Sequence, residues 1–231
     1  QALVDVETMS ELLGEEPEVS DRLEATPLKV SAGRVSFEDV SFGYDKRRRI
    51  VDKVSFEIPP GRSLALVGSS GGGKSTITKL LFRFYDVDAG TIRIDGQDIR
   101  DVTQRSLRRA IGVVPQEVVL INDTVRNNLR FSRADATDDE IAHAVASSQL
   151  GATIEKMPAG LDTIVGERGL KLSGGEKQRL AIARAILKDA PIALVNEEAS
   201  SVDVSSGADP RCDREARAEQ DGGRRRATGA H

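Results

Sequence analysis

Hydrophobic and polar positions along the chain predict strands of two kinds. Apolar residues alternate with polar ones at Val35 and Phe37 and again over 54–58, which predicts two strands with one buried face each. A further pair of strands is expected within 91–99, around the hairpin signal Asp95-Gly96. Short continuous apolar runs predict buried parallel strands, and they occur at 63–67, 111–115 and 191–195.

Segments with helical spacing separate these runs. Residues 74–85 follow one apolar run, and most of 122–160 has a helical pattern that Gly151 is expected to interrupt. Two capping boxes mark helix starts, at Thr137 with Glu140 and at Ser173 with Glu176. Strands that alternate with helices predict an α/β core with a parallel sheet.

The two ends of the chain differ from its middle. Residues 1–14 have the spacing of a short amphipathic helix, and 15–33 are acidic with two prolines, which is typical of a linker. Because the sequence starts inside the helical pattern, we expect it to be a piece of a longer protein. Residues 205–231 contain no Val, Ile, Leu, Met, Phe or Tyr, so a disordered tail is expected after a domain at 34–204.

Composition excludes several classes of protein. Of 231 residues, 39% are hydrophobic and 30% charged, which suits a globular domain, and no apolar run reaches the roughly 18 residues that cross a membrane. The net charge of −4 argues against a nucleic-acid partner. One cysteine excludes an internal disulfide, and two histidines leave too few ligands for a Cys/His metal site. The basic run at 46–49 is expected to be a solvated loop rather than a phosphate-binding patch.

A glycine-rich loop carries the clearest chemical signal. Its sequence GSSGGGKST fits the pattern G-x-x-x-x-G-K-[ST] and lies between a predicted strand and a predicted helix. The glycines let backbone N–H groups turn towards phosphate oxygens, while the helix directs its positive end at the same anion. Lys74 can reach the β- and γ-phosphates, and the Ser75 hydroxyl can bind Mg²⁺. The predicted phosphate-binding residues are Gly68, Ser69, Ser70, Gly71, Gly72, Gly73, Lys74, Ser75 and Thr76.

A second motif resembles a known family. The octapeptide LSGGEKQR at 172–179 is similar to the signature sequence of ATP-binding cassette (ABC) ATPases. Its candidate residues are Leu172, Ser173, Gly174, Gly175, Glu176 and Gln178. The resemblance covers residues 1 to about 203 and is strongest to half-transporters of the B subfamily, including heavy-metal-tolerance and mitochondrial exporters. The segments that carry it are 4–13, 81–86, 92–99 and 166–179.

The resemblance implies roles for further residues. Tyr44 matches the aromatic residue that stacks on the adenine ring, and Gln116 matches the glutamine that senses Mg²⁺. Glu167 resembles a residue that faces the coupling helices of the membrane domain. Glu197 stands where the family has the carboxylate that orients or activates the attacking water, and Asp203 lies in the matching D-loop.

The sequence departs from the family at two places. Asn196 stands where the family has an Asp that holds the Mg²⁺ shell, which predicts weaker Mg²⁺ retention; an alternative register would match Glu197 and Glu198 to the family's Asp-Glu pair. No apolar strand follows residue 204, and the terminal His231 is not expected to act as the family's switch histidine. A reading-frame or splice error near residue 204 is one explanation of this tail, and a degenerate paralogue is the other.

The implied fold is a P-loop NTPase core with a parallel sheet, an antiparallel β subdomain and an α-helical signature subdomain at about 117–175, with the C-terminal part of the core missing. The implied cofactors are ATP and Mg²⁺. The implied partners are a second such domain, in a head-to-tail dimer, and a transmembrane domain upstream, in a membrane that can be mitochondrial or vacuolar. The leading function is therefore an exporter ATPase. The alternatives are a regulatory domain that binds ATP with little hydrolysis and a soluble ABC-type protein of DNA repair or translation.

Overall fold

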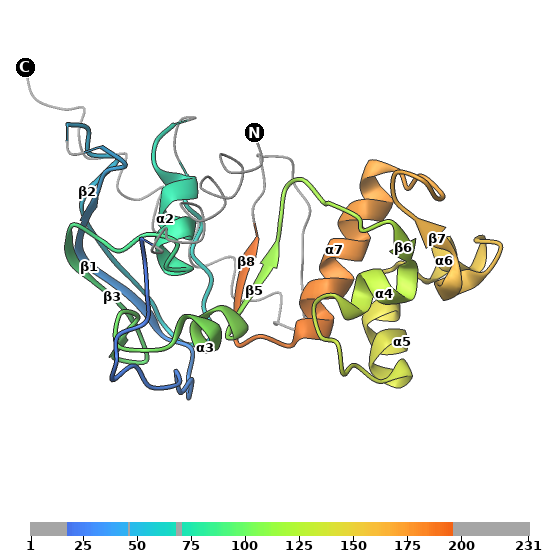
Figure 1. Cartoon of the computed structure of the whole chain (residues 1–231), viewed down its shortest axis with the longest axis horizontal. Coiled ribbons are helices and arrows are strands. Elements are labelled where there is room, and N and C mark those ends of the chain that lie inside the picture. Colours follow the sequence, from blue (N-terminus) through green and yellow to red (C-terminus); the bar gives the residue numbers. More distant parts are fainter. Residues whose placement is uncertain (1–17, 46, 68–70, 196–231) are drawn as a thin grey trace, which may run out of the picture. The chain divides into compact units, whose positions relative to one another are not determined.

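The computed structural model describes residues 18–45, 47–67 and 71–195 (Figure 1). Several predictions lie outside these residues: the helix at 1–14, the loop residues Gly68, Ser69 and Ser70, the tail, and all candidates from Asn196 onward. Within the described part, no helix is both long enough and apolar enough to cross a membrane.

Four strands form an antiparallel sheet in the order β2-β1-β3-β4. The alternating pattern is confirmed, because Val35 and Phe37 are each only 2% exposed and pair with Ile58 and Phe56 of the neighbouring strand. The predicted hairpin at Asp95-Gly96 is also confirmed, with both residues at positive φ. The strands are β1 (Val35–Phe42), β2 (Val51–Ile58), β3 (Ala89–Ile94) and β4 (Gln97–Asp98).

Two short helices pack apolar side chains into the same core as this sheet. Helix α2 (Lys74–Leu81) contributes Leu80 and Leu81, and α3 (Gln104–Arg109) contributes Leu107. Leu80 and Leu107 are completely buried. Helix α2 is therefore anchored by its C-terminal turn, which leaves its N-terminal end for another role.

The parallel sheet is smaller than the sequence predicts. Strands β5 (Ile111–Val114) and β8 (Ile192–Val195) pair in parallel, as expected, but residues 63–67 form no strand. Leu64 is 45% exposed and Val67 94% exposed, so the expectation of a buried strand there is wrong. A parallel strand is stable when a neighbour satisfies its hydrogen bonds and layers cover its faces, and the two-stranded sheet of the described residues supplies neither to this segment.

The remaining helices form a second apolar core. They are α4 (Val125–Arg130), α5 (Asp138–Ser147), α6 (Gly151–Glu155), the 3₁₀ helix η1 (Gly160–Asp162) and α7 (Gly174–Lys188), with strands β6 (Asp123–Thr124) and β7 (Ile164–Val165). Both predicted capping boxes are confirmed, at the starts of α5 and α7. Gly151 was expected to end a helix and instead begins α6; the preceding helix ends at Ser147, and Gln149 takes the left-handed conformation with φ of 57°.

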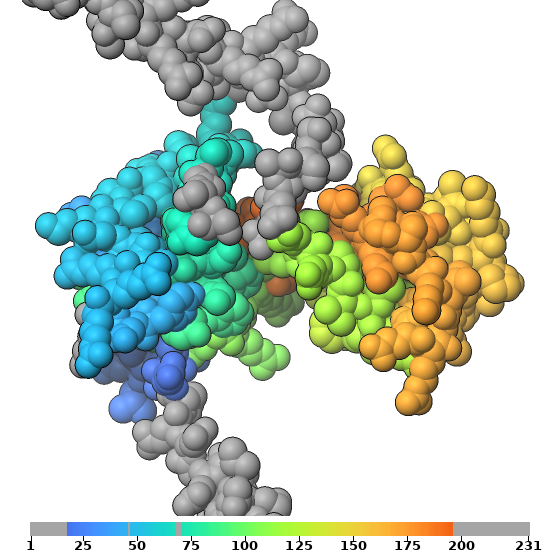
Figure 2. Space-filling view, turned by 90° about the horizontal axis from the view of Figure 1, so that it is seen from above, coloured from blue at the N-terminus to red at the C-terminus, as the bar shows by residue number. Residues whose placement is uncertain are grey.

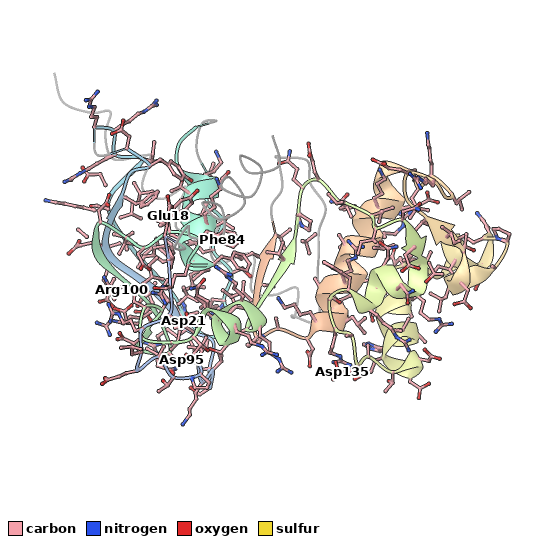
Figure 3. The ribbon with its side chains drawn as sticks, viewed as in Figure 1. Glu18, Asp21, Phe84, Asp95, Arg100 and Asp135 are labelled. Carbon is pink, nitrogen blue, oxygen red and sulfur yellow. The ribbon has the colours of Figure 1, made fainter. Side chains whose placement is uncertain are left out.

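Residues 18–34, predicted largely as a linker, are hydrogen-bonded to the sheet region. The Asp95 carboxylate accepts hydrogen bonds from four consecutive backbone N–H groups, those of residues 31–34, at 2.8–3.1 Å. Desolvation acts to raise the pKa of Asp95, but these N–H groups outweigh it and hold the pKa far below its usual range. The Asp21 carboxylate accepts the N–H of Gln104 at the start of α3 (Asp21 and Asp95 are labelled in Figure 3). This segment is therefore fixed along the domain and is called the strap below.

Candidate functional site

The N-terminal end of α2 has the features of an anion site. Gly73 caps the helix in the left-handed conformation with φ of 83°, and a Cβ atom there would lie 3.1 Å from the Ile50 carbonyl oxygen. Lys74 and Ser75 begin the helix, and its first turn holds no acidic residue. The first turn itself therefore brings no negative charge to the partial positive charge of the helix end, which suits a phosphate group.

Tyr44 lies beside this first turn. Its hydroxyl is 3.4 Å from the Thr76 Oγ1, and Tyr44 as a residue is 49% exposed. In the space-filling view, the surface of the residues after Tyr44, in light blue, borders that of α2 in teal (Figure 2). The structure thus brings the predicted base-stacking residue, which is exposed, next to Thr76 in the first turn of the predicted phosphate-binding helix.

The signature motif lies at the start of α7. Ser173 is the N-cap; its hydroxyl accepts the Glu176 N–H, and the Glu176 carboxylate accepts the Ser173 N–H and hydroxyl at 2.7 Å each. These two hydrogen bonds hold the pKa of Glu176 below its usual range. Gly174 and Gly175 are exposed in the first turn, whereas Leu172 is 7% exposed and anchors the motif in the helical core. The motif thus presents a second exposed helix N-terminus.

Gln116 and Glu167 are both exposed on loops. Gln116 follows β5 by two residues, and Val114 at the end of β5 pairs with Val195 at the end of β8. The carboxyl ends of these parallel strands therefore meet at one edge of their sheet, which is where ligands bind in open α/β sheets. Among the described residues, no hydrogen bond joins the Gln116 side chain to the first turn of α2 or to the signature motif.

Two hydrogen-bonded polar residues, one buried and one half-buried, were missed by the sequence analysis. Asn128 is completely buried and its side chain bonds the backbone of Ile121, Asp123 and Thr124. Arg184 of α7 bonds Asn128 in turn, and burial lowers the pKa of its guanidinium group. The sequence held one signal, for Asn128: its amide stands at a position of the helical pattern that the spacing of the neighbouring apolar residues assigns to the buried face of the helix.

Lys188, at the C-terminal end of α7, was also missed. Its Nζ donates hydrogen bonds to the carbonyl oxygens of Arg108 and Ile111, at 2.9 and 2.5 Å. Burial lowers the pKa of this ammonium group. The helix that starts at the signature motif is therefore fastened to the beginning of β5, the strand that leads to Gln116.

Comparison with known proteins extends these observations. A family model described as "ABC transporter" matches residues 51–200, which is 150 of the 231 residues. "ATP-binding cassette sub-family B member 6" of Homo sapiens is 54% identical over 203 residues, which cover 88% of this chain and 24% of that protein. "Iron-sulfur clusters transporter ATM1, mitochondrial" of Debaryomyces hansenii is 52% identical over 208 residues, which cover 88% of this chain and 30% of that protein.

A solved structure gives the same relationship in three dimensions. The "Structure of a bacterial Atm1-family ABC exporter with ATP bound" superposes with a TM-score of 0.81 at 45% identity, over 95% of this chain and 37% of that one. The chain thus spans about a quarter to a third of the curated relatives named here. With the phosphate loop and the signature motif both at helix N-termini, these matches show that the chain belongs to the ABC transporter family and represents its nucleotide-binding ATPase domain.

Proposed function

We propose that this chain binds and hydrolyses ATP to power an ABC exporter of the B-subfamily half-transporter type. The observation that carries the proposal is the N-terminal end of α2, where Lys74, Ser75 and Thr76 lie in the first turn and Tyr44 lies against it. A nucleoside triphosphate combines the two groups that these elements suit, a polyphosphate and a planar base. The similar bacterial exporter was solved with ATP bound, which supports the choice of nucleotide.

In this proposal Lys74 neutralises charge on the β- and γ-phosphates, and Tyr44 stacks on adenine. The backbone N–H groups of Gly71, Gly72 and Gly73, with those of Gly68, Ser69 and Ser70, surround the phosphates. Mg²⁺ would be held by the Ser75 hydroxyl and the Gln116 side chain, whose neutral oxygen atoms fit a hard cation, and bound Mg²⁺ would neutralise charge on the phosphates. Glu197 orients the attacking water, and catalysis consists mainly of positioning and charge neutralisation.

The signature motif acts on a second copy's nucleotide. An exposed helix N-terminus is formed or supported by Leu172, Ser173, Gly174, Gly175, Glu176 and Gln178, and such an end suits an anionic phosphate. Two chains arranged head to tail would place each signature opposite the partner's phosphate loop, with Asp203 at their interface. Closing and opening of this dimer would move a transmembrane domain, through contacts that include Glu167. The domain would face the cytosol or an organelle matrix; mitochondrial and vacuolar membranes are the candidates, and the name of one relative, "Iron-sulfur clusters transporter ATM1, mitochondrial", supports the first.

A second candidate function is ATP binding with little hydrolysis, as a regulatory partner of an intact domain. Asn196 favours it, because an amide brings no charge to the Mg²⁺ shell. The exposed apolar residues of 63–67 favour it as well, because the strand predicted beside the phosphate loop does not form among the described residues.

The test separates binding from turnover. ATP binding is measured by titration calorimetry and hydrolysis by phosphate release, on the wild-type chain, on Lys74→Ala and on Glu197→Gln. The ATPase is supported if Lys74→Ala abolishes ATP binding and Glu197→Gln abolishes turnover. Binding without measurable turnover supports the regulatory candidate. A wild-type chain that binds no ATP overturns both.

A further inference from the structure

The turn between α2 and β3 contacts the hairpin that carries Tyr44 at two points. Tyr85 and Asp88 both lie in this turn, a few residues beyond the end of α2. We propose that they are positioning residues, which hold the Tyr44 ring in the orientation that stacks on a nucleotide base. The inference rests on the proposed nucleotide-binding function and assigns two residues to it that neither sequence motif contains.

The first contact is aromatic. The Tyr85 and Tyr44 ring centres are 5.1 Å apart with planes at 85°, which is an edge-to-face geometry. Phe42 lies 5.1 Å from Tyr44, also at 85°, and 5.4 Å from Tyr85. Each ring thus contacts the other two. Because Phe42 is only 5% exposed and fixed in the core, a rotation of Tyr44 would break both of its aromatic contacts.

The second contact fixes the backbone next to Tyr44. The Gly43 N–H donates to the Asp88 Oδ2 at 3.0 Å, and the Asp88 N–H donates to the Ser41 carbonyl oxygen at 2.9 Å. A Cβ atom at Gly43 would lie 2.4 Å from the Arg48 carbonyl oxygen, so the hairpin folds back tightly at this point. The Arg48 N–H closes it by donating to the Asp45 carbonyl oxygen. The backbone of Tyr44 is therefore held in place from both sides. Asp88 fixes the residue before it, and the closed hairpin fixes the residues after it.

The same stretch of chain also forms the phosphate end of the site. Helix α2 places Thr76 3.4 Å from the Tyr44 hydroxyl and the Lys79 Nζ 5.3 Å from the centre of the Tyr44 ring. Tyr85 and Asp88 follow in the segment that connects α2 to β3. One continuous segment therefore begins at the phosphate-binding end of α2 and ends at the residues that orient Tyr44. This arrangement fixes the spacing between the base and the phosphates, and favours a complete nucleotide over a bare polyphosphate.

The experiment compares two ligands that differ in the base. ATP and inorganic tripolyphosphate are titrated calorimetrically into the full chain, as wild type, Tyr85→Leu, Tyr85→Phe, Asp88→Ala and Asp88→Asn. Tyr44→Ala and the double variant Tyr44→Ala/Tyr85→Leu complete a double-mutant cycle. Tripolyphosphate serves as the internal control, because it needs the phosphate loop and not Tyr44.

We expect Tyr85→Leu and Asp88→Ala to weaken ATP binding about three- to tenfold and to leave tripolyphosphate binding within about twofold. Tyr85→Phe keeps the ring and Asp88→Asn keeps an acceptor oxygen, so both should retain wild-type ATP affinity. Tyr44→Ala should weaken ATP binding about tenfold or more, since it removes the stacking itself. In that background Tyr85→Leu should cause no further loss.

Three results would overturn the proposal. Equal losses for ATP and tripolyphosphate in Tyr85→Leu would assign Tyr85 a purely structural role. A loss that persists undiminished in the Tyr44→Ala background would show that Tyr85 does not act through Tyr44. Unchanged ATP affinity in Tyr85→Leu and Asp88→Ala would overturn the positioning role and leave the proposed function standing. A wild-type chain that binds neither ligand would instead overturn the proposed function and the positioning role together.

Discussion

Arg184 donates hydrogen bonds to both oxygen atoms of Asn128, from Nε to the backbone oxygen and from Nη2 to the side-chain oxygen, each at 2.7 Å. The pair joins α7, which begins at the signature motif, to α4. Asn128 also bonds both the N–H and the carbonyl oxygen of Ile121. The signature helix and the loop that follows Gln116 are therefore connected through the buried Asn128 amide and through a direct hydrogen bond from Arg184 Nη1 to the Val119 carbonyl oxygen, at 3.0 Å.

Replacing this amide with an apolar side chain should destabilise the domain. Asn128→Leu removes the side-chain acceptor of Arg184 and the hydrogen bonds that the amide makes with the backbone of Ile121, and each buried polar group left without a partner costs about 1–3 kcal/mol. Urea unfolding followed by circular dichroism measures the change. Asn127→Ala is the matched control, because Asn127 is the neighbouring residue on α4 and is exposed; it should cost less than about 1 kcal/mol. Equal effects of the two substitutions would show that the buried network contributes nothing specific.

The Asp95 carboxylate should make stability depend on pH. Its pKa is lower in the folded chain than in the unfolded one, so ionised Asp95 favours the folded state. This stabilisation is complete above the unfolded pKa, near about 4, and is lost as the pH falls towards the folded pKa. We expect Asp95→Ala to cost about 1–2 kcal/mol at neutral pH, since it removes the acceptor for four N–H groups of the strap.

The measurement is urea unfolding of wild type and Asp95→Ala between neutral and acidic pH. The difference between them should shrink as the pH falls below about 4. Glu155→Gln serves as the control, because Glu155 is exposed and no hydrogen bond of its side chain is observed among the described residues. A difference that stays constant down to low pH would mean that the Asp95 charge does not stabilise the strap.

Local sequence signals predicted much of this fold, because they act within a few residues. Alternation predicted β1 and β2, and the capping boxes at Thr137 and Ser173 predicted the starts of α5 and α7. The apolar run at 63–67 was misleading, since an apolar segment forms a strand only where a neighbour pairs with it. Gly151 was misleading for a related reason: glycine is compatible with either end of a helix, and the turn preceding it already ends α5.

The same distinction between local and long-range signals applies to the candidate site. The phosphate loop and signature motif are contiguous in sequence, so a pattern identifies them. The strap could not be predicted, because the carboxylate that organises it belongs to Asp95, 61 to 64 residues further along the chain. Tyr85 and Asp88 were missed for the same reason, since their contacts with Tyr44 and Gly43 exist only after the sheet has formed.

The two capping boxes offer a matched test of the signature motif. Ser173→Ala and Thr137→Ala remove the same kind of helix cap from α7 and from α5. Each should lower stability by about 1 kcal/mol, measured by urea unfolding. Only Ser173→Ala should reduce phosphate release, because only that helix end is proposed to contact the partner's nucleotide. Equal losses of phosphate release would attribute the effect to stability alone.

Introducing a negative charge at residue 196 should tighten Mg²⁺ binding at the proposed site and so lower the Mg²⁺ concentration that turnover requires. A unit charge pair near 4 Å is worth about 4 kcal/mol at an effective dielectric constant of about 20, and Asn196 forgoes that attraction. We expect Asn196→Asp to lower the Mg²⁺ concentration for half-maximal phosphate release at least tenfold and to raise the maximal rate. An ordinary Mg²⁺ requirement in the wild type would contradict this reasoning.

Two further substitutions decide which carboxylate acts on the water. If Asn196 and Glu197 occupy the positions of the family's Asp-Glu pair, Glu197→Gln should abolish hydrolysis while ATP still binds, and Glu198→Gln should have little effect on hydrolysis. If Glu197 and Glu198 form that pair instead, Glu198→Gln should abolish hydrolysis and Glu197→Gln should mainly weaken the response to Mg²⁺. The two registers therefore predict opposite outcomes from the same pair of variants, and Asn196→Asp improves turnover only in the first.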